Sequence, residues 1–163
     1  MKVFIKNKLM SIEGSSKVTN EQGEDVFKVE GKLISPTKKK RMYDMQGNLL
    51  YTIRNKYWTF FCNKVLIYDK DNNKVAVIKK NKFSFNAKYQ ILEAVDDMSI
   101  EGRIFRRDAK IMRNGEVAAT LRSEFTLFKD AFSLEASEED IAFMTAIVIG
   151  FDNMKDKIQD SRD

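Results

Sequence analysis

The residues of this sequence that could do chemistry and are most closely clustered are basic: lysines and arginines that could bind an anion. Clustered Lys and Arg attract phosphate and other anions, and each one near an anionic membrane contributes about 1 kcal/mol of binding. Four together would contribute about 4 kcal/mol, a weak association unless a pocket or an apolar anchor adds to it. The other interpretation of such a run is a solvated loop that enters a strand. The candidate anion-binding residues form two groups: Lys38, Lys39, Lys40 and Arg41, and then Arg103, Arg106 and Arg107.

Composition excludes most enzyme chemistry. The chain has no histidine, which removes Ser-His-Asp and Cys-His triads and histidine-based zinc sites. Its single cysteine, Cys62, excludes an internal disulfide, and its seven glycines form no dinucleotide-binding or phosphate-binding loop. The sequence therefore predicts a protein that is not an enzyme, with no catalytic residue, no metal and no cofactor.

Two acidic segments are the remaining candidates for chemistry. The segment Asp69–Asn73 opens like a calcium loop, but lysines stand where an EF-hand needs its glycine and its last glutamate. We therefore interpret it as a hairpin turn. Glu93, Asp96 and Asp97 have the residue type for general acid–base catalysis. Because no partner for them is identifiable, a solvated loop is the simpler interpretation.

The richest aromatic stretch is Tyr57–Phe61, which we expect in the core. The alternative is a stacking surface for single-stranded nucleic acid, and the exposure of Trp58 would separate the two interpretations. Cys62 follows this stretch and is interpreted as a small buried hydrophobic residue.

The fold of the chain must position these candidate residues. The chain has 163 residues, of which 43% are hydrophobic and 33% charged, and this composition is typical of one soluble globular domain. Up to Ala136 apolar and polar residues alternate with period two, as in Phe27–Glu30, Leu49–Arg54 and Val117–Arg122. Period two with β-branched and aromatic residues predicts half-buried strands. Turn residues between these stretches divide them into twelve candidate strands with short antiparallel connections.

An internal repeat organises the strands. The pattern Ile-basic-x-x-x-x-Ser/Thr recurs from Ile5, Ile53 and Ile78, and each copy is followed by another strand-like stretch. The simplest account is two six-stranded halves, at about 2–70 and 74–136. Any β-rich chain with Lys and Arg on its outer face would show part of this pattern.

The last segment is helical. Ser137 stands three residues before Asp140, which is a capping-box pattern, and apolar residues from Ile141 to Phe151 then cover every face. Seven of them are large, so exposing them would cost on the order of 10–20 kcal/mol, as much as a whole domain's stability. Eleven helical residues rise about 16 Å, roughly half of a bilayer core. The sequence therefore predicts that the strands close around this helix, which also leaves the sheet without free edges.

Several short motifs, each weak alone, carry a family resemblance through their order and spacing. They are Phe27-x-Val29-Glu30-Gly31, Tyr43-Asp44-Met45-Gln46-Gly47, Ala76-x-Ile78-Lys79-Lys80, Ile100-Glu101-Gly102, Asn114-Gly115-x-Val117-Ala118 and the terminal acidic-then-apolar helix. Over nearly its whole length the chain resembles the LURP-one-related family in its small bacterial form, within the tubby C-terminal-like and phospholipid scramblase-like superfamily. That superfamily includes phosphoinositide-binding tubby domains. No tubby lipid-binding motif or scramblase calcium motif is present, so the resemblance implies a fold and assigns no residue a role.

The predicted fold class is mainly β with one helix (α+β), a closed twelve-stranded antiparallel β-barrel around a central hydrophobic C-terminal helix. We expect a single domain over 1–158, with strands over about 2–136 and the helix over about 138–157. A polar tail is expected over 159–163.

The predicted function is a non-enzymatic binding module that recognises anionic phospholipid headgroups through the basic residues. The alternative is a structural or protein-interaction scaffold with no lipid affinity. The net charge of +5 suits an anionic partner, and it also suits solubility alone. Lysines interrupt the apolar residues of the N-terminal segment, so we expect no signal peptide and no transmembrane segment. The expected location is the cytoplasm, peripheral to the inner face of the membrane; a protein partner stays open and nucleic acid is disfavoured.

Overall fold

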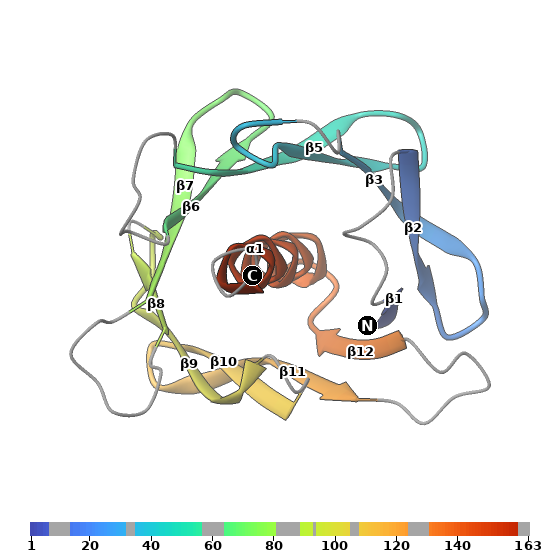
Figure 1. The fold of residues 1–163 in the computed structure, drawn as a ribbon. Helices are drawn as coiled ribbons and strands as arrows, with labels where there is room; N and C mark the ends of the chain where they lie inside the picture. Colours follow the sequence, from blue (N-terminus) through green and yellow to red (C-terminus); the bar gives the residue numbers. More distant parts are fainter. Residues whose placement is uncertain are drawn as a thin grey trace.

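The structure is a computed structural model that describes residues 1–6, 14–31, 35–56, 64–80, 89–92, 94–104, 108–123 and 131–159. Each strand pairs antiparallel with its neighbours in chain order, and β1 pairs with β12 to close the ring (Figure 1). The strands are β1 (Lys2–Lys6), β2 (Gly14–Asn20), β3 (Asp25–Gly31), β4 (Lys40–Asp44), β5 (Leu49–Asn55), β6 (Lys64–Asp69), β7 (Lys74–Lys80), β8 (Tyr89–Leu92), β9 (Met98–Arg103), β10 (Asp108–Arg113), β11 (Glu116–Ser123) and β12 (Ala131–Ala136). The predicted closed twelve-stranded barrel is confirmed, with six strands in each expected half.

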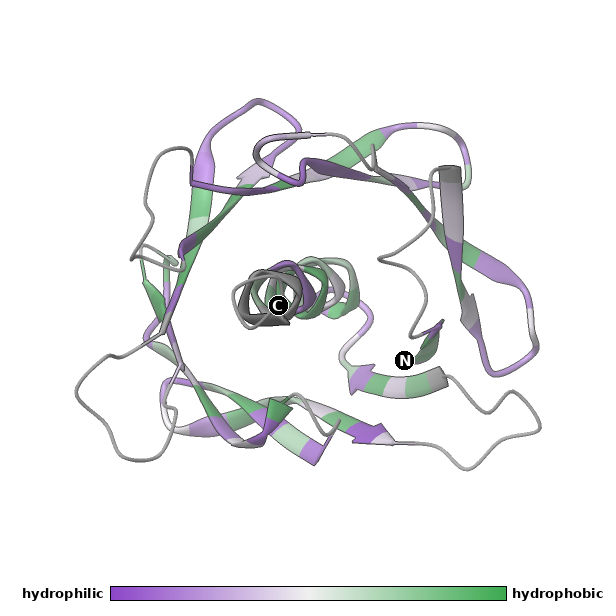
Figure 2. Cartoon of the chain, in the orientation of Figure 1, coloured by the Kyte–Doolittle hydropathy of each residue, from purple (hydrophilic) through white to green (hydrophobic). Residues whose placement is uncertain are grey.

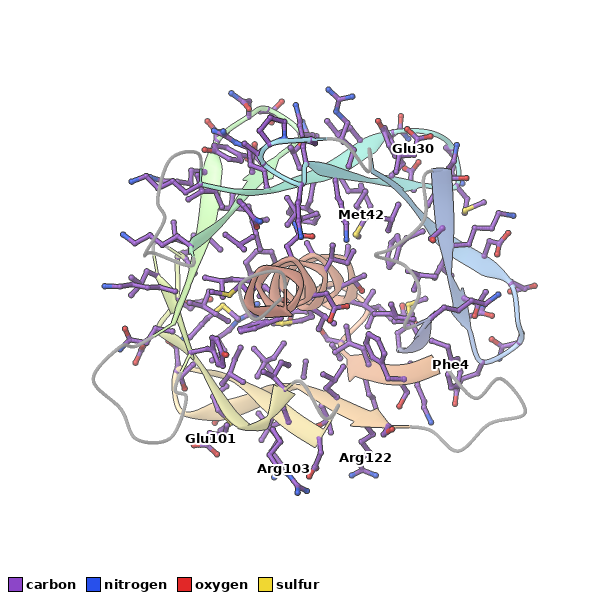
Figure 3. All side chains as sticks on the ribbon, viewed as in Figure 1. Phe4, Glu30, Met42, Glu101, Arg103 and Arg122 are labelled. Carbon is purple, nitrogen blue, oxygen red and sulfur yellow. The ribbon has the colours of Figure 1, made fainter. Side chains whose placement is uncertain are left out.

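Successive side chains of a strand point alternately into and out of the barrel. The strands accordingly alternate between hydrophobic and hydrophilic residues in Figure 2. Ile5, Ile53 and Ile78, which start the repeated pattern, are fully buried. The basic residue that follows each of them therefore points to the outer face. In Figure 3, Met42 points into the barrel, whereas Arg103 and Arg122 point away from it.

The helix α1 (Ile141–Gln159) runs through the ring (Figure 1). Ile147 and Phe151 are fully buried, and the ring of the half-buried Phe143 lies 5.8 Å from that of Tyr51. The wall therefore encloses the apolar segment, as predicted, which removes its surface from water. The helix packs most closely on β5, β6, β12 and β7.

A capping turn precedes the regular helix, which begins at Ile141 rather than near residue 138. The Ser137 hydroxyl accepts a hydrogen bond of 3.2 Å from the backbone N–H of Asp140, and the N–H of Ile141 donates to the Ser137 carbonyl at 3.0 Å. The predicted N-cap contact is thus observed, and it satisfies backbone donors that the helix leaves free.

The two ends of the barrel differ. At one end, which we call the hairpin end, short turns join β2 to β3, β4 to β5 and β6 to β7. Asn20, Asp44 and Asp69 open these turns, and the side-chain oxygen of each accepts backbone N–H groups two and four residues later. Since α1 follows β12, it starts at the hairpin end and runs back to the opposite end.

Candidate functional site

The two predicted basic groups lie at the same end of the barrel. Gly31 ends β3 beside Lys40, which begins β4, and Arg103 ends β9 beside Asp108, which begins β10. Strands alternate in direction around the ring, so these two junctions share the end opposite the hairpin end, which we call the basic end. They lie on opposite sides of it, because β3 and β9 are separated by half of the ring. This half-ring relation is the one that two six-stranded repeats require.

The first basic group starts in a turn that hydrogen bonds from α1 and β5 hold in place. The N–H of Lys38 donates to the Ser35 carbonyl at 2.9 Å, and Lys38 has a left-handed φ of 46°. The Lys38 carbonyl accepts a hydrogen bond of 3.1 Å from the side-chain amide of Asn153 on α1. The Thr37 carbonyl accepts one of 2.7 Å from the N–H of Asn55 on β5. The helix and the wall therefore hold this loop in position.

The strand divides the basic run into two faces. Lys39 and Arg41 are exposed, whereas the side chain of Lys40 turns into the barrel and is only 7% exposed. Gly31 makes room for it, because a Cβ at Gly31 would lie 3.3 Å from Cγ of Lys40. The sequence treats Lys38–Arg41 as one exposed run. The structure separates Lys40 from it, so an anion outside the barrel meets the other three.

Arg103, in the second group, is exposed and already has a partner. Its Nη2 lies 2.6 Å from Oδ2 of Asp108, across the β9–β10 pair. Both side chains are more than half exposed, so solvent screens this ion pair and it contributes little stability. The carboxylate does reduce the positive charge that Arg103 offers to an anion. Arg106 and Arg107 lie outside the described residues.

Beneath the basic end lies a buried polar layer that the sequence analysis missed. Asn55 and Asp152 are 2% exposed and Asn153 is fully buried. Among the described residues, neither the amide nitrogen nor the amide oxygen of the Asn55 side chain has a hydrogen-bond partner. A usable signal was present: Asn55 follows Ile53 by two residues and so shares its inward face, and Asp152–Asn153 directly follow the apolar segment of the helix.

At the hairpin end, charged residues fasten the start of the helix. Arg113 on β10 donates two hydrogen bonds of 2.9 Å to the two carboxylate oxygens of Asp140, and its Nε lies 3.4 Å from Asp96. The hydrogen bond from Arg113 is the largest cause that lowers the pKa of Asp140. Asp96 is therefore part of a structural cluster rather than a free general acid. Glu93 lies outside the described residues.

The acidic turns are hairpin turns, as predicted for Asp69–Asn73. Hydrogen bonds from the side chains of Asn48 and Asn73 are the largest causes that lower the pKa of Asp44 and Asp69. Within the described ranges, no group of three or more Cys, Asp or Glu residues is arranged to hold a metal ion. Tyr57–Phe61 and Cys62 fall outside those ranges, so their predicted environments stay predictions.

A closed antiparallel barrel filled by one helix, with basic residues at one end, defines a helix-filled β-barrel class of protein. The sequence model of the LURP-one-related family matches residues 1–152, and the chain belongs to this family. Within the part of the chain that is described, no helix is long and apolar enough to cross a bilayer.

Two other proteins are similar to this chain over most of its length. The chain is 25% identical over 153 residues to the uncharacterized protein YxjI of Bacillus subtilis (strain 168), covering 93% of this chain and 92% of that protein. The X-ray structure of the Arabidopsis thaliana protein AT5G01750 superposes with a TM-score of 0.62 at 15% identity, covering 93% of this chain and 90% of the other. The latter similarity supports the fold alone.

Proposed function

We propose that this protein is a non-enzymatic binding module that recognises anionic phospholipid headgroups through its basic end. The observation that carries the proposal is that Lys38, Lys39 and Arg41 share one end of the barrel with Arg103. A flat anionic surface can meet both sides of that end at once. The net charge of +5 adds a general attraction to such a surface.

Charge magnitudes keep the proposed association weak and reversible. Lys39, Arg41 and Arg103 are exposed, and at about 1 kcal/mol each they would contribute about 3 kcal/mol. Asp108 reduces the share of Arg103. Binding should therefore depend strongly on salt, because the Debye length falls from about 10 Å at 0.1 M to about 3 Å at 1 M.

Vesicle flotation tests the proposal. The protein should float with phosphatidylcholine vesicles that contain phosphatidylserine and not with phosphatidylcholine alone, and added salt should release it. The double variant Lys39→Glu/Arg41→Glu should abolish flotation. Its matched control, Lys70→Glu/Lys74→Glu, changes the net charge equally at the β6–β7 turn of the hairpin end and should float as the unmodified protein does.

The outcomes divide the two candidate functions. Loss of binding in both double variants would mean that net charge alone, and not the basic end, attracts the protein. Failure of the unmodified protein to float with any anionic vesicle would reject lipid recognition and favour a scaffold without lipid affinity.

A further inference from the structure

A pocket of about 550 Å³ opens at the hairpin end, opposite the basic residues. Four segments that are distant in sequence form it: Met1, the start of β3, the β4–β5 turn, and the first residues of α1 with the turn before them. It is a depression that is widely open to solvent rather than an enclosed cavity.

The pocket lining is mixed, and apolar side chains make up slightly more than half of it. The apolar part of the lining is formed by Met1, Val26, Phe27, Met45, Ile141 and Ala142. Met1 and Met45 are 39% and 44% exposed, and they are among the few large hydrophobic side chains that the described surface leaves in contact with water. Methionine is flexible and polarizable, and it is common on surfaces that bind apolar groups of varied shape. This part of the lining therefore suits the apolar body of a ligand.

The charged groups of the pocket are mostly acidic. Asp25, Asp44 and Glu138 line it, and no described Lys or Arg does. The Asp44 carboxylate accepts hydrogen bonds from Gln46 and Asn48 of its own turn, and Asp25 pairs with Lys17. The positive group on the lining is the terminal ammonium of Met1, which donates a hydrogen bond of 2.6 Å to the Ala136 carbonyl.

We propose that this pocket binds an organic cation, a ligand with an ammonium group on an apolar body. The apolar part of the lining contacts the body, and the carboxylates of Glu138 and Asp44 favour a cation over an anion of the same shape. The site is independent of the proposed headgroup recognition, because it lies at the other end of the barrel and has the opposite charge.

Isothermal titration calorimetry with three eight-carbon probes, n-octylammonium, 1-octanol and octyl sulfate, tests the proposal. All three probes are used below their critical micelle concentrations. Binding is assigned to the pocket only if the variant Ala142→Phe removes it, because a phenylalanine side chain at this position should fill the pocket. Octylammonium should bind about tenfold more tightly than octyl sulfate, since the carboxylates of the exposed Glu138 and the partly buried Asp44 attract the ammonium group and repel the sulfate group. Undetectable octylammonium binding at millimolar concentration would overturn the proposal, and so would equal or tighter binding of octyl sulfate.

A charge-matched pair of variants keeps the test decisive if Ala142→Phe does not fold. Glu138→Gln should weaken octylammonium binding about two- to fivefold and leave 1-octanol binding unchanged. Glu139→Gln removes an exposed carboxylate from the next residue, which does not line the pocket, and should leave both unchanged. Equal effects of the two variants would show that the ammonium binds elsewhere and would reject the site.

Discussion

The side-chain amide of Asn153 on α1 donates a 3.1 Å hydrogen bond to the backbone carbonyl of Lys38, 115 residues earlier in the chain. This bond joins the second half of the central helix to the loop that precedes β4 and carries the first basic residues. The loop is therefore held by the same element that fills the barrel.

Replacing Asn153 should loosen this link. Asn153→Ala removes a fully buried side chain and its hydrogen bond to the Lys38 carbonyl, so we expect the free energy of unfolding to fall by about 1–3 kcal/mol. Urea denaturation measures the change. Gln90→Ala on the exposed face of β8 is the matched control and should change it by less than about 0.5 kcal/mol. Equal losses in the two variants would contradict a structural role for the bond.

Neighbouring basic residues on β4 should behave differently. Arg41→Met removes an exposed charge and, under the proposed function, should weaken vesicle binding about fivefold, as expected for a loss of about 1 kcal/mol. Lys40→Met removes a charge that faces the interior and should leave vesicle binding unchanged. Flotation at a fixed low salt concentration compares them. Weaker binding in Lys40→Met alone would mean that the anion site lies inside the barrel.

Gly150 should not tolerate a methyl group. Glycine in a helix interior normally costs about 1 kcal/mol relative to alanine, so propensity alone favours Gly150→Ala. A Cβ there would lie 2.6 Å from Cδ1 of Ile78 and 3.3 Å from Cγ1 of Val65, however, and overpacking costs about 1–3 kcal/mol. We therefore expect net destabilisation in urea or thermal unfolding.

A second-site change checks the cause of that destabilisation. Ile78→Val deletes the clashing Cδ1 and alone should cost about 0.5–1.5 kcal/mol. In the double variant with Gly150→Ala the two losses should be less than additive. Strict additivity, or stabilisation by Gly150→Ala alone, would mean that the helix does not lie this close to β7.

Asp140 should make stability fall in acid. Its pKa is lowered in the folded state, chiefly by the hydrogen bond from Arg113. A lowered folded-state pKa contributes stability above the ordinary pKa of about 3.8, and this stability is lost as pH falls through the folded-state value. Asp140→Asn should therefore be less stable than the unmodified protein at pH 7, with the difference shrinking below about pH 4.

Denaturant unfolding at several pH values measures this effect. Glu139→Gln removes a carboxylate from the same turn, where the residue is exposed, and is the control. A pH profile of Asp140→Asn parallel to that of the unmodified protein would reject the assigned role of the Arg113 pair.

Much of the architecture was predictable because its signals are local. Alternation around Ile5 and Ile53 identified wall strands, since an apolar residue beside a polar one reveals which face is buried. The spacing of Ser137 and Asp140 marked the start of the helix, because a cap is a contact between near neighbours in sequence.

The sequence by itself determined the strands, the capped helix and the need to bury that helix on all sides. Tertiary structure alone decided that Lys40 points inward, because a run of four basic residues has no apolar contrast to reveal the phase of the strand. The tertiary structure also brought Arg113 to Asp140 and Met45 to Ala142. Each of these pairs depends on contacts between distant segments, which exist only once all twelve strands have closed around the helix.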